Sequence, residues 1–176
     1  MTPWELLESR GHKEYVGEAV TILQHSLQTA LFAQGAGASD ALVAAALLHD
    51  IGHFAHAAGL DATRRGIDPR HEARGAELLM QWFGPEVAEP VRLHVDAKRY
   101  LVGEDPAYAE GLSVESQNTL RLQGGPMTEA QRADFEGRPH WREALQLRRW
   151  DDQAKIVGLN VPPVSDYLEL LLELRL

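Results

Sequence analysis

The chain has 176 residues, of which 44% are hydrophobic and 24% are charged, a composition typical of one folded domain. It contains no cysteine, which excludes disulfide scaffolds, thiolate zinc sites and cysteine nucleophiles. The 17 basic and 26 acidic residues give a formal net charge of -9, and such an acidic surface repels nucleic acids, so we expect no nucleic-acid partner.

Helical periodicity runs through almost the whole chain, and no segment alternates apolar and polar residues as a half-buried strand does. We predict helices over residues 21–34, 41–53, 68–84, 86–100, 113–122, 128–135, 141–157 and 165–174. The second is apolar on all sides, which is typical of a central helix. A capping box from Thr128 to Gln131 opens the sixth, and residues 103–109 are expected to form a loop. The sequence therefore predicts an all-α, single-domain helical bundle over residues 1–176, with its C-terminal helix at about 165–174.

Eight histidines are many for this length. His49 and Asp50 end the most apolar helix, where an ionised carboxylate is costly to bury without a partner or a metal. His53 follows His49 by four residues and can share its helix face. Further His and Asp residues fall on other predicted helices: His25, His71, His94 and Asp151. A bundle can direct such side chains to a common centre, so this pattern predicts a metal site. Three histidines are expected to be ordinary packed or surface residues: His12, His56 and His140.

Along the chain a His, a His-Asp pair and a distal Asp follow one another: His25, His49, Asp50 and Asp151. This order resembles the HD-domain superfamily of metal-dependent enzymes, an all-helical fold named for its His-Asp pair. In that superfamily the four corresponding residues bind one metal. The additional His71 and His94 resemble the subset that binds two metals, which implies that Asp50 bridges them.

The segment around His25 resembles a narrower family. Residues 15–28, YVGEAVTILQHSLQ, are similar to the corresponding stretch of the mixed-valent diiron oxygenases that cleave the carbon–phosphorus bond of 1-hydroxyphosphonates. In that family a Tyr and a Glu, here Tyr15 and Glu18, cover an open iron position until substrate displaces them. The resemblance runs from about residue 15 to about residue 152, and the ligand set resembles myo-inositol oxygenase more distantly.

Further positions match the same family downstream. Lys98 follows His94 by four residues, as the phosphonate-binding lysine does. Ser116 and Thr119 stand where the family places hydroxyl groups near substrate, and His53 matches a histidine beside the metal centre. The resemblance thus implies catalytic roles for Tyr15, Glu18, His53 and Lys98. Without it, Lys98 reads as a solvated helix lysine and the two hydroxyl residues as caps.

The resemblance implies an iron-dependent oxygenase with two iron ions, Fe(II)/Fe(III), and dioxygen as co-substrate. It would convert a small 1-hydroxy-2-(trimethyl)aminoethylphosphonate-type substrate to a carboxylic acid and phosphate, and Glu18 could pair with the substrate amine. The choice between a 2-aminoethyl and a trimethylammonioethyl substrate would depend on the pocket wall around the ammonium, where the candidate cation–π rings are Phe54, Tyr100 and Tyr108. The donor set of histidines and carboxylates suits iron, manganese, cobalt or zinc, so it does not by itself select the metal.

Two other functions stay open: an HD-type phosphohydrolase acting on a phosphate ester, and a non-catalytic metal-binding HD module. The Tyr15-to-Glu18 segment tells against the hydrolase, because water activation has no evident need for a cover over an open metal position. We expect a monomer or weak homodimer, in the cytoplasm, with no membrane association, because the longest apolar run, 41–48, is too short to span a bilayer.

Several remaining residues are expected on the surface or against the core. Arg148 and Arg149 are expected on a solvated helix face, and Glu72 is expected to be a surface charge. The apolar residues 164–176 are expected to pack on the domain itself rather than on a second subunit.

Overall fold

The computed structural model describes residues 1–15, 17–54 and 70–176, and its described part is built of helices with one isolated bridge between Glu14 and Thr21. The elements in chain order are α1 (Pro3–Arg10), α2 (Ile22–Gly35), α3 (Asp40–Leu48), η1 (Ile51–Phe54), α5 (His71–Leu79), α6 (Pro85–Glu104), α7 (Pro106–Glu110), α8 (Val114–Leu122), α9 (Glu129–Glu136), α10 (Trp141–Gln153), η2 (Val164–Tyr167) and α11 (Leu168–Glu173). The all-α fold class is confirmed.

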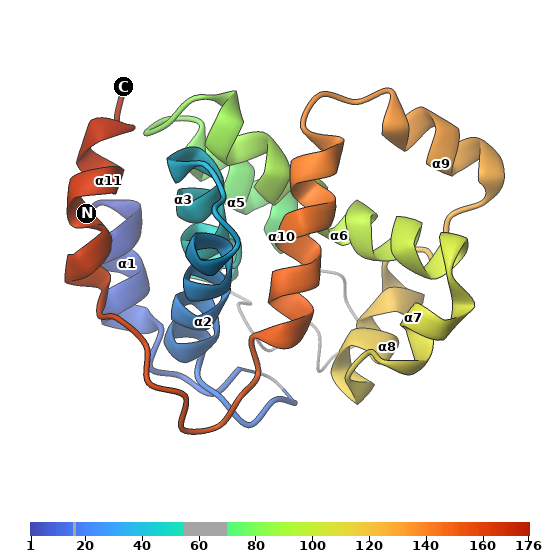
Figure 1. The fold of residues 1–176 in the computed structure, drawn as a ribbon, viewed down its shortest axis with the longest axis horizontal. Helices are drawn as coiled ribbons and strands as arrows, with labels where there is room; N and C mark the ends of the chain where they lie inside the picture. Colours follow the sequence, from blue (N-terminus) through green and yellow to red (C-terminus); the bar gives the residue numbers. More distant parts are fainter. Residues whose placement is uncertain (16, 55–69) are drawn as a thin grey trace.

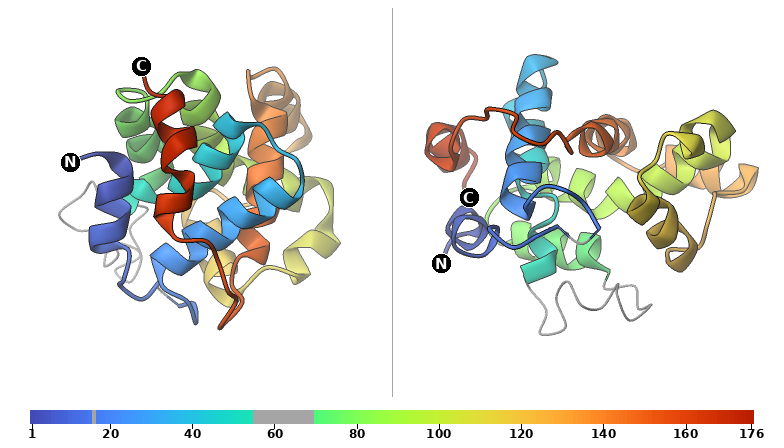
Figure 2. Two further views of the ribbon diagram at one scale, coloured as in Figure 1. Left: turned by 60° about the vertical axis from the view of Figure 1, so that its left-hand side comes forward. Right: turned by 90° about the horizontal axis from the view of Figure 1, so that it is seen from below.

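Helix α3 is the centre of the bundle. Every residue from 42 to 48 is buried, and α3 contacts α2, α6, α10, α1 and α11. Figure 1 and Figure 2 show α1 and α11 together at one end of the molecule, α7, α8 and α9 at the other, and α10 between them. A second apolar cluster, which includes Leu93, Phe135 and Ala144, joins α6, α9 and α10. The apolar α3 therefore holds the helices that carry the candidate site.

Local signals set several helix starts as predicted. The Thr21 side chain accepts a hydrogen bond from the Gln24 amide while Gln24 reaches back to the Thr21 amide, which satisfies two free N–H groups at the start of α2. The same box, from Thr128 to Gln131, opens α9. A third, between Thr2 and Glu5, opens α1, a helix that the sequence analysis did not predict.

Three predicted boundaries differ from the structure. The helix expected over residues 41–53 is two elements, because α3 ends at Leu48 and the short η1 begins at Ile51. The loop expected over 103–109 is wrong, since α6 extends to Glu104 and α7 follows, capped by Asp105. The helix expected to end at residue 157 ends at Gln153. The expected helix start at residues 68–69 and the assignment of His56 lie outside the described residues.

The C-terminal residues pack on the domain, as expected. Val164, Tyr167 and Leu171 are buried in the main core, and the Leu176 amide donates a hydrogen bond to the Trp82 carbonyl at 3.0 Å. Within the described residues, no helix combines the length and the apolar character needed to cross a membrane.

Candidate metal centre

Two buried histidines and a carboxylate from three helices meet at one point. His25 lies in α2, His49 caps the end of α3 and Asp151 lies near the end of α10. The His25 Nε2 atom is 3.1 Å from His49 Nε2 and 3.2 Å from Asp151 Oδ1. The Nδ1 atoms of His25 and His49 bind the carbonyl oxygens of Ala154 and Ala46, at 2.8 and 2.9 Å.

Those carbonyl contacts decide what the two Nε2 atoms can do. A carbonyl oxygen only accepts, so each Nδ1 carries the proton and each Nε2 of a neutral ring presents a lone pair. Two lone pairs and a carboxylate oxygen therefore face one another in a buried space, an arrangement that needs a positive charge between them. The contact with Asp151 accordingly raises the pKa of His25, although burial opposes the shift. This donor group, His25, His49 and Asp151, can hold a metal ion.

A second donor group, Asp50, His71 and His94, lies beside the first. The Nε2 atoms of His71 and His94 are 3.1 Å apart, and His94 Nδ1 binds the Val91 carbonyl at 2.7 Å. Burial lowers the pKa of His94 to about 4 and that of His71 well below 6.5, so both rings are neutral near pH 7. Neutral imidazoles are the form that binds metals.

Asp50 stands between the two groups with one carboxylate oxygen toward each. Its Oδ2 lies 3.5 Å from His49 Nε2 and 3.7 Å from His25 Nε2, whereas its Oδ1 lies 3.4 Å from His71 Nε2. Burial would raise the pKa of Asp50, but the imidazoles, His49 first, hold it well below its usual range. The Oδ2 atom is buried and has no hydrogen-bond partner, as expected of an atom that binds a cation.

Close packing at Gly52 brings the second group to the first. A Cβ atom at this position would lie 1.9 Å from the His71 carbonyl oxygen and 2.7 Å from the Gly75 amide nitrogen, so only glycine lets η1 contact α5. The glycine follows Asp50 by two residues, and α5 begins at His71. The approach of these two backbones thus sets the distance between Asp50 and His71.

Two predicted residues, Tyr15 and His53, lie against the donor groups. The Tyr15 ring stacks on His25 with centroids 4.6 Å apart and an interplanar angle of 19°. Burial, with Asp50 nearby, raises the pKa of the Tyr15 hydroxyl well above 10, so it is protonated. The His53 ring stacks on His71 at 4.2 Å, and its Nε2 is 3.6 Å from Asp50 Oδ1.

The predicted substrate residues gather on a neighbouring wall formed by α6 and α8. Lys98 is 2% exposed, and its Nζ donates to Thr119 Oγ1 at 2.9 Å and to the Ser116 carbonyl at 3.4 Å. Burial, with Arg148 nearby, lowers the pKa of Lys98 from 10.5 to about 7. Glu18 reaches the same wall, where its Oε1 accepts from Ser113 Oγ at 2.6 Å. The structure thus brings Lys98, Ser116, Thr119 and Glu18 together.

Comparisons with known proteins agree with this geometry. The HD domain family model matches residues 22–132. The chain belongs to the HD-domain family. A hydroxymethylphosphonate dioxygenase from Gimesia maris is 45% identical over 93% of this chain and 82% of its own length. A [1-hydroxy-2-(trimethylamino)ethyl]phosphonate dioxygenase (glycine-betaine-forming) from Leisingera caerulea is 40% identical over 89% of this chain and 80% of its own. Within the HD-domain family the chain is therefore one of the phosphonate oxygenases.

Two surface assignments are wrong for this HD domain. Arg148 is 5% exposed and binds Asp151 Oδ2 at 2.9 Å and also Asp152, so it is a buried partner of a donor residue. Arg148 precedes two aspartates by three and four residues on one helix, a spacing that indicates ion pairs within the helix. Glu72 is not a surface charge either, because its side chain is 14% exposed and its Oε2 lies 3.7 Å from His71 Nδ1. Arg149 is exposed, as expected.

Lys155, just beyond α10, is a further residue of the site and was not among the predicted ones. Its Nζ donates to Glu18 Oε1 at 2.8 Å, to Ser113 Oγ at 3.1 Å and to Ser116 Oγ at 3.3 Å. These contacts join residues up to 137 positions apart in the chain, so no local sequence pattern predicts them.

Two of the aromatic rings expected around a substrate amine have other partners. The Tyr108 hydroxyl binds Asp152, beside Arg148. Another expected ring, Tyr100, belongs to the second apolar cluster, and its hydroxyl donates to Glu136.

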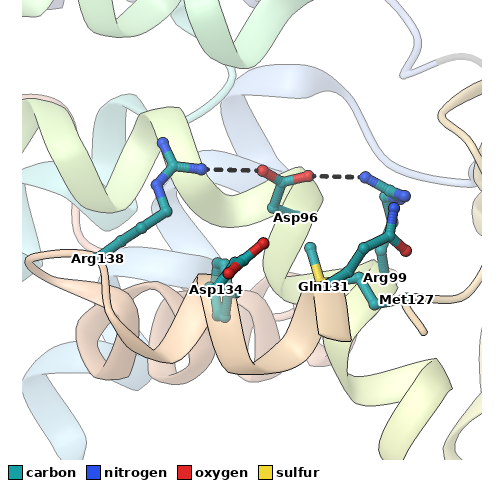
Figure 3. Close-up of a pocket in the computed structure, with 7 residues that line it drawn as sticks. Asp96, Arg99, Met127, Gln131, Asp134 and Arg138 are labelled. Atoms are coloured by element: carbon teal, nitrogen blue, oxygen red, sulfur yellow. Dashed lines mark hydrogen bonds and ion pairs between the residues drawn. The ribbon is translucent and has the colours of Figure 1, made fainter. Parts of the chain in front are cut away.

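A surface hollow of about 180 Å³ lies apart from these groups, between α6 and α9 (Figure 3). Asp96 binds Arg99 at 3.1 Å and Arg138 at 3.2 Å across it. None of the predicted site residues lines the hollow, and the ion pair of Asp96 with Arg138 connects α6 to the segment after α9.

Proposed function

We propose that this protein is an iron-dependent oxygenase that cleaves the carbon–phosphorus bond of a small 1-hydroxyphosphonate to give a carboxylic acid and phosphate. The observation that carries the proposal is the pair of buried donor groups joined by Asp50, next to a wall of buried cations, in a chain 40–45% identical to two phosphonate dioxygenases. The reaction balances with one dioxygen per substrate and needs no further reductant, because the substrate supplies all the electrons.

We assign His25, His49 and Asp151 to one iron, His71 and His94 to the other, and Asp50 to both. The unpartnered Asp50 Oδ2 and the facing Nε2 atoms of His25 and His49 fit this assignment. Two bound irons in the Fe(II)/Fe(III) state would supply the redox chemistry with dioxygen.

The remaining residues bind and orient substrate or exclude water. Lys98, held by Thr119 and Ser116, places a cation where an anionic phosphonate can bind, and the Ser116 and Thr119 hydroxyls can donate to its oxygens. Tyr15, stacked on His25, covers the first donor group and keeps water from it until substrate enters. His53 holds the orientation of Asp50 and of His71.

The relatives differ in the organic group of their substrates. The expected trimethylaminoethyl substrate has the support of the Leisingera caerulea relative, whereas the Gimesia maris relative is named for hydroxymethylphosphonate. Binding of a substrate amine would require a free carboxylate at Glu18, and in the structure that carboxylate binds Lys155.

The test is to load the protein with iron without oxygen, add a 1-hydroxyphosphonate, admit oxygen, and measure phosphate release against oxygen uptake. We expect a ratio of one. Phosphate release from a phosphate ester without oxygen uptake would instead identify a hydrolase, and no turnover would leave a metal-binding module. Metal analysis tests the ligands: we expect two irons per chain, at most one in His71→Ala, and loss from the other position in His25→Ala.

A further inference from the structure

Lys155 already neutralises the carboxylate that a substrate amine would need. Its Nζ lies 2.8 Å from Glu18 Oε1, and the same oxygen accepts from Ser113 at 2.6 Å. The Glu18 and Lys155 side chains are only 10% and 15% exposed, so water screens this pair weakly.

The backbone fixes Lys155 in place. The preceding carbonyl, of Ala154, accepts from His25 Nδ1 at 2.8 Å. The following residue, Ile156, binds the Gln28 side chain twice, through its amide at 3.0 Å and its carbonyl at 2.8 Å. The residues on both sides of Lys155 are therefore tied to α2, the helix that carries His25, and the ammonium is part of the site wall.

Three cationic groups converge on Ser116. Lys155 Nζ lies 3.3 Å from its Oγ, Arg148 Nη2 lies 3.4 Å from its Oγ, and Lys98 Nζ lies 3.4 Å from its carbonyl oxygen. The carboxylates on this wall have partners among these cations: Glu18 binds Lys155, and Asp151 and Asp152 bind Arg148. A phosphonate dianion matches this wall. A substrate that also carried an ammonium group would bring a fourth cation to this wall, where the three carboxylates just named already bind cations.

We propose that Lys155 makes this site selective for 1-hydroxyphosphonates whose organic group is uncharged, by occupying the position of a substrate ammonium. The inference rests on the proposed function and narrows its substrate class. Lys155 is thus a specificity-determining residue that acts through repulsion of the wrong substrate.

Binding of two ligands of equal size tests the proposal. The first, 1-hydroxypropylphosphonate, differs from the second, 2-amino-1-hydroxyethylphosphonate, by a methyl group in place of the ammonium. Dissociation constants are measured by calorimetry on the iron-loaded protein without oxygen, so that no turnover occurs. We expect the wild type to bind the propyl compound at least about tenfold more tightly, which is the effect of one charged contact.

The variants separate charge from size. Lys155→Met frees Glu18 to bind the amine, and we expect the ratio of the two constants to shift toward the amine by about ten- to a hundredfold. Lys155→Arg keeps the charge and should keep the wild-type preference. Lys13→Met, at an exposed lysine, is the matched control and should leave the ratio unchanged.

Two results would overturn the proposal: a wild type that prefers the amine, or a Lys155→Met ratio within about twofold of the wild type. If that unchanged ratio came with an equal weakening of both ligands, Lys155 would be an anchor for the phosphonate. Admitting oxygen afterwards tests the proposed function separately. Selective binding without phosphate release would refute the function and leave the selectivity standing.

Discussion

Replacing Lys98 with methionine removes a charge that the fold buries at a cost in stability. The side chain is 2% exposed, and burial, with Arg148 nearby, lowers its pKa from 10.5 to about 7, a shift that corresponds to about 5 kcal/mol. Methionine avoids this cost and loses the hydrogen bond to Thr119, worth about 1.5–3 kcal/mol. We therefore expect Lys98→Met to raise the free energy of unfolding of the metal-free protein by about 2–3 kcal/mol at about pH 6.

The gain should depend on pH in a defined direction. Below pH 7 the folded and unfolded chains both carry the Lys98 proton, and the full cost is present. Between about 7 and 10.5 the unfolded chain holds a proton that the folded chain has released, so the wild type gains stability as pH rises and the advantage of Lys98→Met shrinks. Groups common to both proteins cancel in this difference.

Chemical denaturation after chelation, at about pH 6 and about pH 9.5, measures the effect. The same substitution should weaken phosphonate binding by about ten- to a hundredfold, because one charge-assisted contact is lost. Lys13→Met, at an exposed position, should change neither quantity. The reasoning is refuted if Lys98→Met is less stable than the wild type at about pH 6, if its advantage does not vary with pH, or if phosphonate binding is unchanged.

Three further substitutions, the first with a matched control, test the geometry of the centre. Gly52→Ala places a Cβ 1.9 Å from the His71 carbonyl oxygen, so it should lower the free energy of unfolding by about 1–3 kcal/mol and cause loss of metal. In the control Gly35→Ala the new Cβ meets nothing within 4 Å, and the free energy of unfolding from denaturation curves should change by less than about 0.5 kcal/mol. Arg148→Met leaves Asp151 without its guanidinium and should cost about 3–5 kcal/mol and reduce bound iron in metal analysis; normal iron content would contradict this role. Tyr15→Phe should raise oxygen uptake per phosphate above one while stability changes by about 1 kcal/mol or less, and an unchanged ratio would remove Tyr15 as a cover.

Local signals explain which parts of the fold were predictable. The boxes at Thr21 and Thr128 involve residues three apart, and both helices start where predicted. The helix expected over 41–53 was wrong because its apolar pattern continues through the break. The break itself is decided by tertiary contacts, since Gly52 must contact α5. Only the box at Thr128 was recognised in the sequence; the equivalent boxes at Thr2 and Thr21 were also present there.

In the candidate site, too, the residues with a local sequence pattern were predictable and those placed by tertiary contacts were not. Histidines on successive helices are visible in the sequence, and the structure does bring them to two adjacent groups. The burial of Arg148 was missed because an arginine beside another arginine is typical of a solvated face. The ion pair of Lys155 with Glu18 links residues 137 positions apart, and only the packing of α2 against the end of α10 brings them together.

The last turn of α10 and the residues after it explain how metal and substrate recognition are joined in one small domain. Within eight residues the chain supplies a metal-donor carboxylate at Asp151, its guanidinium partner at Arg148, the carbonyl at Ala154 that fixes the His25 tautomer, and the ammonium at Lys155. The Ile156 backbone then ties this segment to α2. Because these contacts share one backbone, a shift of the α10 end must move a metal donor and the charge of the substrate wall together. Helix α8 supplies the Ser116 carbonyl and the Thr119 hydroxyl that bind Lys98, and no residue of α8 belongs to the two donor groups, so changes in α8 should alter the fit of the substrate more than the binding of metal.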